Sequence, residues 1–271
     1  MAGQNEINNM ALFCDFENVA LGVRDAKYPQ FDIGKVLERL LLKGSIVVKK
    51  AYCDWERYKD FKKPMHEASF ELIEIPHVRQ SGKNSADIRM VVDALDLCYT
   101  KAHVDTFVII SGDSDFSPLV SKLRENNKRV IGVGVKDSTS DLLAANCDEF
   151  IYYDDLVRAQ EVKTSRAAKK VSAAKPADAT LKPAKTEDDK RQEGLDFLVE
   201  TVEALAAERG SDEKIWGSMA KQTMQRRKPG FNESYYGYRS FKEMVEDAEK
   251  RKLLVMARDE RTGQYSIMLP A

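Results

Sequence analysis

The sequence predicts an α/β protein: a parallel sheet with helices on both faces, followed by a small carboxyl-terminal winged helix-turn-helix domain. Three observations lead to this prediction. Strand-like apolar runs alternate with helix-like segments up to residue 157 of the 271 residues, and such alternation is typical of a parallel sheet covered on both faces. Large apolar residues then become rare over 158–192. Residues 193–271 return to a helical pattern that ends in two strand-like runs.

Two carboxylates follow the strand predicted at 106–110, where the chain leaves the sheet. This run is almost wholly apolar and leads into Ser111, Gly112, Asp113 and, two residues later, Asp115. Ligands of open parallel sheets bind at the carboxyl ends of the strands. Capping of the following helix would explain one acid at this place, but it does not explain two. The turn is therefore a candidate functional site.

A further acid, Asp15, follows the apolar run 10–14 in the same way. If this strand and the strand at 106–110 are both central and parallel, Asp15, Asp113 and Asp115 meet at one edge of the sheet.

The helix predicted to begin at Ser85 supplies a fourth acid. Asp87 shares the apolar stripe of this helix with Val91. Burial of an unpaired carboxylate costs several kcal/mol, so Asp87 needs a partner, and a metal ion is the simplest one. Asp93 falls instead on the polar face, where an ion pair with Arg89 is the expected role.

Clustered carboxylates repel one another unless they take up protons or bind a cation. Mg²⁺ and Mn²⁺ prefer oxygen ligands of this kind and promote hydrolysis of phosphate esters. The sequence has no P-loop, no Gly-x-Ser-x-Gly elbow and no His-Glu-x-x-His pair, so a metal-dependent nuclease or phosphatase is the natural class. A phosphatase with an Asp nucleophile needs Asp-x-Asp after the first strand, where this chain has Asp-Phe-Glu.

The remaining segments complete the pattern of the first domain. Further strands are predicted at 46–48 with 51–52, 72–75, 130–133 and 150–153, and helices at 33–42 and 56–70. Hydroxyls and an acid precede an apolar pair in the segment 138–143, which is a helix-start signal. We expect these hydroxyls to cap that helix; the alternative is that they also face a phosphate of the substrate.

Four ordered motifs span residues 8–157. They are Asp15-x-Glu17-Asn18, Lys83-x-x-x-Asp87-x-x-x-x-x-Asp93-Ala94, Ser111-Gly112-Asp113-x-Asp115-Phe116, and Gly132-x-Gly134 before Asp148-x-Phe150. Together they resemble the NYN domain of the PIN-like superfamily of metal-dependent ribonucleases, and in particular its LabA or DUF88 branch. The resemblance implies a PIN-like fold and a divalent-metal-dependent endoribonuclease.

The resemblance also implies roles for the matched residues. Asp15, Asp87, Asp113 and Asp115 would be catalytic residues that hold one or two Mg²⁺ or Mn²⁺ ions. Asp93 would join them in the catalytic site, against its position on the polar face.

Three polar residues accompany the acids in these motifs. By the same resemblance, Asn18, Lys83 and Ser111 would orient the metal ligands or bind the scissile phosphate of the substrate. Lys83 also ends the polar stretch 79–83, which fits a solvated loop equally well.

Residues 158–192 are predicted to be a basic, disordered linker, because they cannot bury enough apolar surface to offset the entropy lost on ordering. Their 10 Lys and Arg against 5 Asp and Glu contrast with 20 against 25 over 1–157. A basic tether beside an acidic domain suits an enzyme that acts on a polyanion. A solvated spacer is the alternative.

Residues 193–271 are predicted to form the second domain. Helices are expected at 193–209, 214–227 and 240–250, followed by strands at 253–256 and 264–268. This order describes a winged helix-turn-helix. Its motifs are Ile215-Trp216-Gly217, Pro229-Gly230-Phe231-Asn232 and Tyr235-Tyr236-Gly237-Tyr238-Arg239-Ser240-Phe241. They resemble the OST-HTH or LOTUS domain, which implies binding of RNA or of a protein partner.

The basic end of the second helix and the tyrosines that follow are the candidate RNA contacts of this domain. Arg226 and Arg227 would bind phosphates, and Tyr236 would stack on an unpaired base. Part of the aromatic cluster is expected in the core instead, notably Phe231 and Tyr238.

No window approaches the roughly 18 apolar residues of a membrane span, and no signal peptide is recognisable. The four cysteines occur singly, as reduced core thiols do. We therefore expect a soluble, cytoplasmic protein that does not bind membranes.

The predicted function is hydrolysis of phosphodiester bonds in single-stranded or structured RNA at an acidic Mg²⁺ or Mn²⁺ site. A water molecule oriented by Asp15 or Asp113 would attack in line, and Lys83 would help to stabilise the charge. The alternative is a non-catalytic RNA-binding or adaptor protein on a PIN-like scaffold. A third class, a DNA-directed or structure-specific nuclease, uses PIN-like sites as well.

Overall fold

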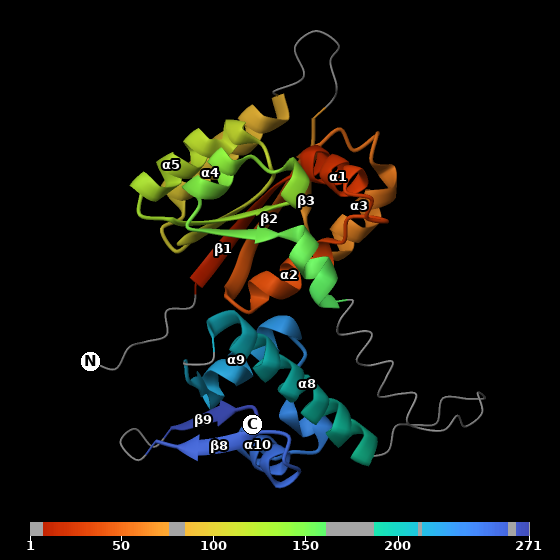
Figure 1. The fold of residues 1–271 in the computed structure, drawn as a ribbon, viewed down its shortest axis with the longest axis vertical. Helices are drawn as coiled ribbons and strands as arrows, with labels where there is room; N and C mark the ends of the chain where they lie inside the picture. The colour runs from red at the N-terminus through yellow and green to blue at the C-terminus, as the bar shows by residue number, and fades with distance from the viewer. Residues whose placement is uncertain (1–7, 76–84, 161–186, 211–212, 260–263, 271) are drawn as a thin grey trace, which may run out of the picture. The chain divides into compact units, whose positions relative to one another are not determined.

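The computed structural model describes residues 8–75, 85–160, 187–210, 213–259 and 264–270. Contacts divide the chain into two compact units, Met1–Ala174 and Lys175–Ala271. Figure 1 shows a sheet with helices in the first unit, whereas the second unit is mainly helical.

A six-stranded sheet forms the centre of the first unit, in the order β3-β2-β1-β4-β5-β6. All five neighbouring pairs are parallel. The strands are β1 (Asn8–Asp15), β2 (Gly44–Cys53), β3 (Glu71–Glu74), β4 (Thr106–Ile110), β5 (Arg129–Gly134) and β6 (Glu149–Tyr152). The strand order runs outward in opposite directions from β1 and β4, so the topological switch point lies between these two strands.

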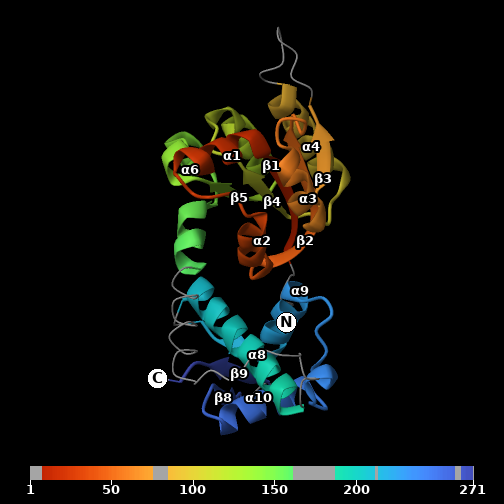
Figure 2. The same cartoon turned by 90° about the vertical axis from the view of Figure 1, so that its right-hand side faces the viewer.

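Helices cover both faces of the sheet (Figure 1 and Figure 2). One face packs against α1 (Phe16–Asp25), α2 (Ile33–Leu41) and α3 (Lys59–Glu67). The other packs against α4 (Ser85–Thr100), α5 (Ser117–Glu125) and α6 (Asp141–Asn146). Two short 3₁₀ turns, η2 (Ser114–Phe116) and η3 (Lys136–Ser138), follow β4 and β5. The predicted α/β fold with a parallel sheet and two helical layers is confirmed.

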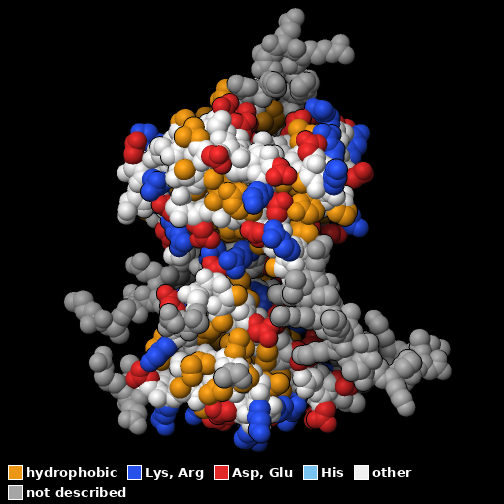
Figure 3. Space-filling view, viewed as in Figure 1, with side chains coloured by type: hydrophobic (Ala, Val, Ile, Leu, Met, Phe, Trp, Pro, Cys, Tyr) orange, Lys and Arg blue, Asp and Glu red, His pale blue; other side chains and the backbone are white. Residues whose placement is uncertain are grey.

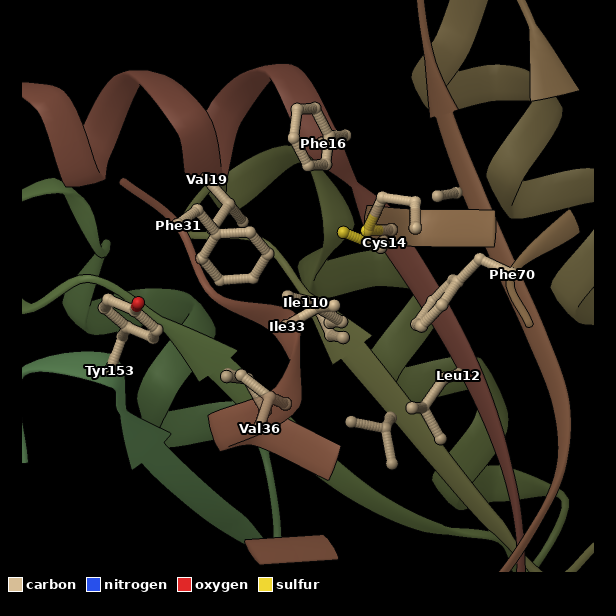
Figure 4. Packing of buried hydrophobic residues seen from close by; sticks show 14 of the residues in the cluster. Leu12, Cys14, Phe16, Val19, Phe31, Ile33, Val36, Phe70, Ile110 and Tyr153 are labelled. Carbon is tan, nitrogen blue, oxygen red and sulfur yellow. The ribbon is translucent and has the colours of Figure 1, made fainter. Parts of the chain in front are cut away.

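Side chains of β1 alternate between two cores because successive residues of a strand point to opposite faces. Leu12 and Cys14 pack with the helices α1 and α2, and Figure 4 shows Cys14 near Phe16 and Leu12 farther along the strand. Phe13 lies in the other core with Met90 of α4. Burial on both faces explains why the central strands read as continuous apolar runs.

Polar side chains fix where two of the helices begin. Asp32 Oδ1 accepts a hydrogen bond from Gly34 N at 2.9 Å at the start of α2, and Ser140 Oγ accepts one from Leu142 N at 3.2 Å at the start of α6. Each bond satisfies a backbone donor that has no partner inside the helix. The predicted capping role of the hydroxyl at Ser140 is confirmed.

The described residues of the second unit form three helices and a small antiparallel sheet of order β7-β9-β8. Its elements are α8 (Glu187–Arg209), β7 (Ile215–Trp216), α9 (Gly217–Arg227), η4 (Glu233–Tyr236), α10 (Phe241–Lys250), β8 (Val255–Arg258) and β9 (Tyr265–Met268). Phe231 and Tyr238 lie in its core, 5% and 2% exposed, as predicted. The elements expected for a winged helix-turn-helix are thus present.

Helix α8 begins at Glu187, inside the segment that the sequence assigns to the linker. Three acidic residues in its first turn favour a helix N-terminus at this place. Residues 161–186 of the predicted linker lie outside the described residues. No helix in the described part of the chain combines the length and the apolar character that crossing a membrane requires.

Candidate functional site

Asp15 and Ser111 join the two central strands at the switch point. The parallel register of β1 and β4 ends with Cys14 beside Ile110, so the next residue of each strand, Asp15 or Ser111, reaches the edge of the sheet. Ser111 Oγ donates a hydrogen bond to Asp15 Oδ2 at 3.0 Å. Asp15 is only 7% exposed and Ser111 is fully buried. The predicted meeting of the two strand ends is therefore present, with Asp15 at its centre.

Three hydrogen bonds between side chains and backbone amides fix the turn after β4. Ser111 Oγ accepts from Asp113 N at 3.2 Å, and Asn18 Oδ1 accepts from Gly112 N at 2.9 Å. Asp113 Oδ1 accepts from Asp115 N at 2.9 Å. Asn18 and Ser111 thus position the backbone that carries Asp113 and Asp115.

The loop after β5 packs directly on this turn. Ser140 N donates to Gly112 O at 2.9 Å, and a Cβ atom at Gly112 would lie only 2.3 Å from Ser138 O. A side chain would therefore clash with backbone, which explains the glycine in the Ser-Gly-Asp sequence.

Mutual repulsion and burial raise the pKa of two of the acids. Burial, and then the charge of Asp87, raise the pKa of Asp15 from 3.8 to about 7. Burial and the charges of Asp113 and Asp115 raise the pKa of Asp87 from 3.8 to about 6. The charge of Asp87 thus acts on Asp15, and the charges of Asp113 and Asp115 act on Asp87, at the carboxyl edge of the sheet.

No Lys or Arg in the described ranges forms an ion pair with any of these four acids. Glu17 is a fifth acid of the region, since its charge also raises the pKa of Asp87. It is bound by Arg57, whose guanidinium lies 3.1 Å from Glu17 Oε1. The other four carboxylates are left without a compensating cation in this part of the chain.

The fit of a metal ion depends on the donors and on their spacing. Among the described residues, no three His, Cys, Asp or Glu side chains lie close enough together to hold a metal ion in their present rotamers. The donors themselves suit Mg²⁺ or Mn²⁺, because hard divalent cations prefer carboxylate oxygens. The uncompensated charge of Asp15, Asp87, Asp113 and Asp115 therefore suits such a cation in chemistry.

Asp93 takes part in a separate network between α4 and β2. Tyr52 Oη donates to Asp93 Oδ2 at 2.9 Å, and Lys50 Nζ lies 3.6 Å from the same oxygen. Arg89 Nε lies 3.1 Å from Asp93 Oδ1, which is the ion pair that the helical spacing predicts. These partners favour a positioning role for Asp93 over the catalytic role that the resemblance implies.

Sequence patterns alone miss Glu17, Lys50 and Tyr52. The sequence carries a signal for Glu17, because this residue stands two positions after Asp15 in the first of the four motifs. Tyr52 lies beside Asp15 in the register of β1 and β2, and that register cannot be read from the sequence. Lys83, the predicted phosphate contact, lies outside the described residues.

The predicted RNA contacts of the second unit are largely internal. Tyr236 is 1% exposed, and Lys228 Nζ donates to its hydroxyl at 2.7 Å. The side chain of Arg227 is 9% exposed and pairs with Glu200 at 2.9 Å. Burial also lowers the pKa of Arg226. The predictions for Tyr236 and Arg227 are therefore wrong. The ring of Tyr236 has no exposed face and cannot stack on a base. Arg227 forms an ion pair within the domain and stabilises it.

Comparison with known proteins bears on the first unit. The NYN domain family matches residues 9–154, more than half of the chain. An uncharacterized protein of Methanocaldococcus jannaschii is 28% identical over 120 residues, which are 44% of this chain and 47% of that protein. The chain thus spans about half the length of this curated relative.

A similar solved structure is the crystal structure of a protein of unknown function from Vibrio parahaemolyticus. It matches with a TM-score of 0.50 and 27% sequence identity, and the match covers 57% of this chain and 98% of that chain. By its motifs, its six-stranded sheet and the match over residues 9–154, the chain belongs to the NYN domain family, which is part of the nuclease-type PIN-like superfamily.

Proposed function

We propose that the protein is a Mg²⁺- or Mn²⁺-dependent endoribonuclease of the LabA branch. The observation that carries this proposal is the shared environment of four acids, Asp15, Asp87, Asp113 and Asp115, at the switch point of the parallel sheet. Acids with strongly raised pKa values cluster at functional sites. The nuclease-type superfamily of the NYN domain supports hydrolysis of RNA as the reaction.

The four acids would hold the metal, which when bound polarises the phosphate and neutralises charge on the leaving oxygen. Ser111 keeps one oxygen of Asp15 in place, and Asn18 fixes the turn that carries Asp113. Asp113 is half-buried, so a substrate can reach it from solvent. In this arrangement Asp15 or Asp113 orients the attacking water and accepts its proton.

The second unit is proposed to be an OST-HTH or LOTUS domain that holds RNA through exposed side chains. Tyr235 is 56% exposed, and Lys190 Nζ lies 5.4 Å from the centre of its ring. An accessible tyrosine beside a cation can stack on an unpaired base while the cation meets the phosphate backbone. Tyr235 therefore takes the role that the sequence assigned to Tyr236.

Cleavage of end-labelled nucleic acid by the full-length protein tests the proposed nuclease. Single-stranded RNA, hairpin RNA and matching DNA are incubated with Mn²⁺, Mg²⁺ or EDTA. We expect RNA to be cut only with metal, and Asp113→Asn to lower the rate by at least about 100-fold. Asp96→Asn is the matched control, because Asp96 is exposed on α4, and it should cut as the wild type does.

A non-catalytic adaptor is the second candidate function, favoured by exposed hydrophobic side chains on the second unit. Val255, Met268 and Leu269 are 41%, 45% and 37% exposed. Figure 3 shows hydrophobic side chains gathered over the hairpin of β8 and β9. Such patches often bind other proteins. Tight RNA binding without cleavage in either Mn²⁺ or Mg²⁺ would leave this function in place of the nuclease.

A further inference from the structure

A groove adjoins the acidic site where η2, α5 and α6 meet. It is shallow and open to solvent, and it is lined by Ser114, Asp115, Ser117, Pro118, Ser121 and Leu142. Asp115 belongs both to the groove and to the group of four acids, so the groove opens beside the carboxylates. Leu142 is 58% exposed although it is a large apolar side chain.

Ser117 carries the unsatisfied polar atom of the groove. The residue is 6% exposed, and its Oγ has no hydrogen-bond partner among the described residues. Buried hydroxyls in folded proteins are normally paired, so the hydroxyl of Ser117 is available to bond a partner at this place. A serine hydroxyl changes direction by rotation about a single bond. Ser117 Oγ can therefore turn toward a molecule that enters the groove.

The lining determines what kind of molecule fits. None of the six lining residues is basic, and Asp115 is acidic, so the groove does not suit a phosphate group. Leu142 and Pro118 offer apolar contact, whereas the serine hydroxyls offer hydrogen bonds. Binding sites for small organic ligands combine these two features. A nucleoside has the matching chemistry, with a flat base and polar groups on base and ribose.

We propose that this groove binds the nucleoside next to the scissile phosphate, with Leu142 against the base and Ser117 hydrogen-bonded to base or ribose. The inference rests on the proposed nuclease function, because it places the phosphate of the same strand at the carboxylates. Leu142 and Ser117 then determine which nucleotide is accepted at the cut.

Abasic substitution in a short RNA tests the groove. One base is removed at a time on either side of the cleaved bond, and kcat/KM of the full-length protein is measured. We expect loss of the base that occupies the groove to lower kcat/KM about tenfold, and Leu142→Ala to lower it by a similar factor on intact RNA. When the two changes are combined, their losses of kcat/KM should not multiply, because both changes remove the same contact between Leu142 and the base. Ser117→Ala should raise KM on intact RNA.

Val47→Ala is the matched control, because Val47 is an aliphatic residue of β2 that is 46% exposed. In this variant, removal of the base should lower kcat/KM by the same factor as in the wild type. Two results would overturn the proposed groove while leaving the nuclease intact. In the first, the losses of kcat/KM from base removal and from Leu142→Ala multiply when the two changes are combined. In the second, Leu142→Ala cleaves intact RNA at the wild-type rate.

A binding measurement separates the groove from the reaction. The methyl signals of Leu142 are followed by NMR in the full-length protein as the same RNA is added in EDTA. A shift of these signals supports the groove even if no metal condition gives cleavage, in which case the proposed nuclease alone fails. If RNA binds and shifts signals elsewhere on the protein while the Leu142 signals stay unchanged, the groove does not bind RNA and the inference is wrong.

Discussion

Asp15 links the fold and the candidate site more closely than any other side chain of the region. Its carboxylate accepts from Asn18 N at the start of α1 and from Ser111 Oγ at the end of β4. The same carboxylate is buried beside other acids, so its charge opposes folding when no cation is bound. Metal binding would remove that penalty.

The stability of the metal-free protein should therefore fall as the pH rises. The pKa of Asp15 is about 7 in the folded chain against 3.8 as the ordinary value, so the folded state binds the proton more tightly. This contribution to stability is complete below about pH 4 and is lost as the pH rises through about 7.

Asp15→Asn isolates this effect, because Asn removes the charge and still caps a helix. The variant should be more stable than the wild type by on the order of 2–4 kcal/mol at about pH 8, with no gain at about pH 4. Urea unfolding in EDTA at the two pH values measures the difference. A variant that is less stable than the wild type at about pH 8 would contradict the charge repulsion described for this site.

Tyr52 is predicted to position α4, and with it Asp87, through its hydrogen bond to Asp93. Tyr52→Phe removes only the hydroxyl, so it should cost about 1–2 kcal/mol of unfolding free energy and also slow cleavage. Tyr28→Phe is the matched control, since Tyr28 Oη donates to Asp154 at 2.9 Å at another place in the first unit. An equal loss of stability with unchanged cleavage in both variants would mean that Tyr52 is purely structural.

At the scale of elements, the turn between β4 and α5 decides whether the site can form. The turn places Asp113 and Asp115, and the loop after β5 lies on it at backbone distance from Gly112. Both segments leave the sheet at the edge where β1 delivers Asp15. The site is thus a consequence of strand order as much as of the acids themselves.

Gly112→Ala tests the close packing of these two loops. The added Cβ would meet Ser138 O at 2.3 Å, so one backbone segment must move, at a cost of about 1–3 kcal/mol in stability. Cleavage should fall together with stability, because the same turn carries Asp113. Gly230→Ala is the control, since a Cβ atom added there would have no atom within 4 Å. Thermal unfolding of both variants decides the comparison; equal melting temperatures would show that the loops are not packed as described.

The sequence predicts much of this element-scale arrangement, because its signals are local. Apolar runs mark the buried strands, and Ser140 marks a helix start by its side-chain chemistry. The pairing of Asp93 with Tyr52 and Lys50 depends on which strands are neighbours and in which register. Neighbours of that kind are set by the whole fold, so no local pattern reveals them.

For the molecule as a whole, we propose that the first unit cleaves RNA and the second unit binds it. Tyr236 shows the limit of sequence reasoning in the second unit: its motif fits a base-stacking residue, yet packing around Phe231 places its ring in the core. Burial of one of two adjacent tyrosines follows from the turn at η4, which the sequence does not specify residue by residue. Tyr235 is left on the surface.

Tyr235→Ala should therefore separate the two activities. RNA affinity should fall by about 5- to 100-fold, the value of one lost stacking contact, whereas kcat at saturating RNA should stay unchanged. Binding is measured by fluorescence anisotropy of labelled RNA and kcat by steady-state cleavage at saturating RNA. Arg227→Ala should instead lower the melting temperature, because it breaks the ion pair with Glu200. Unchanged RNA affinity in Tyr235→Ala would remove this residue from the proposed RNA surface.

Four acids at the switch point of the sheet are proposed to form one divalent-cation site. The most direct test is the loss of the electron paramagnetic resonance signal of free Mn²⁺ when full-length protein is added, with and without short RNA. We expect at least one Mn²⁺ to bind per chain and Asp113→Asn to weaken this binding strongly, while Asp96→Asn leaves it unchanged. No binding by the wild type, or equal binding by Asp113→Asn, would contradict the account.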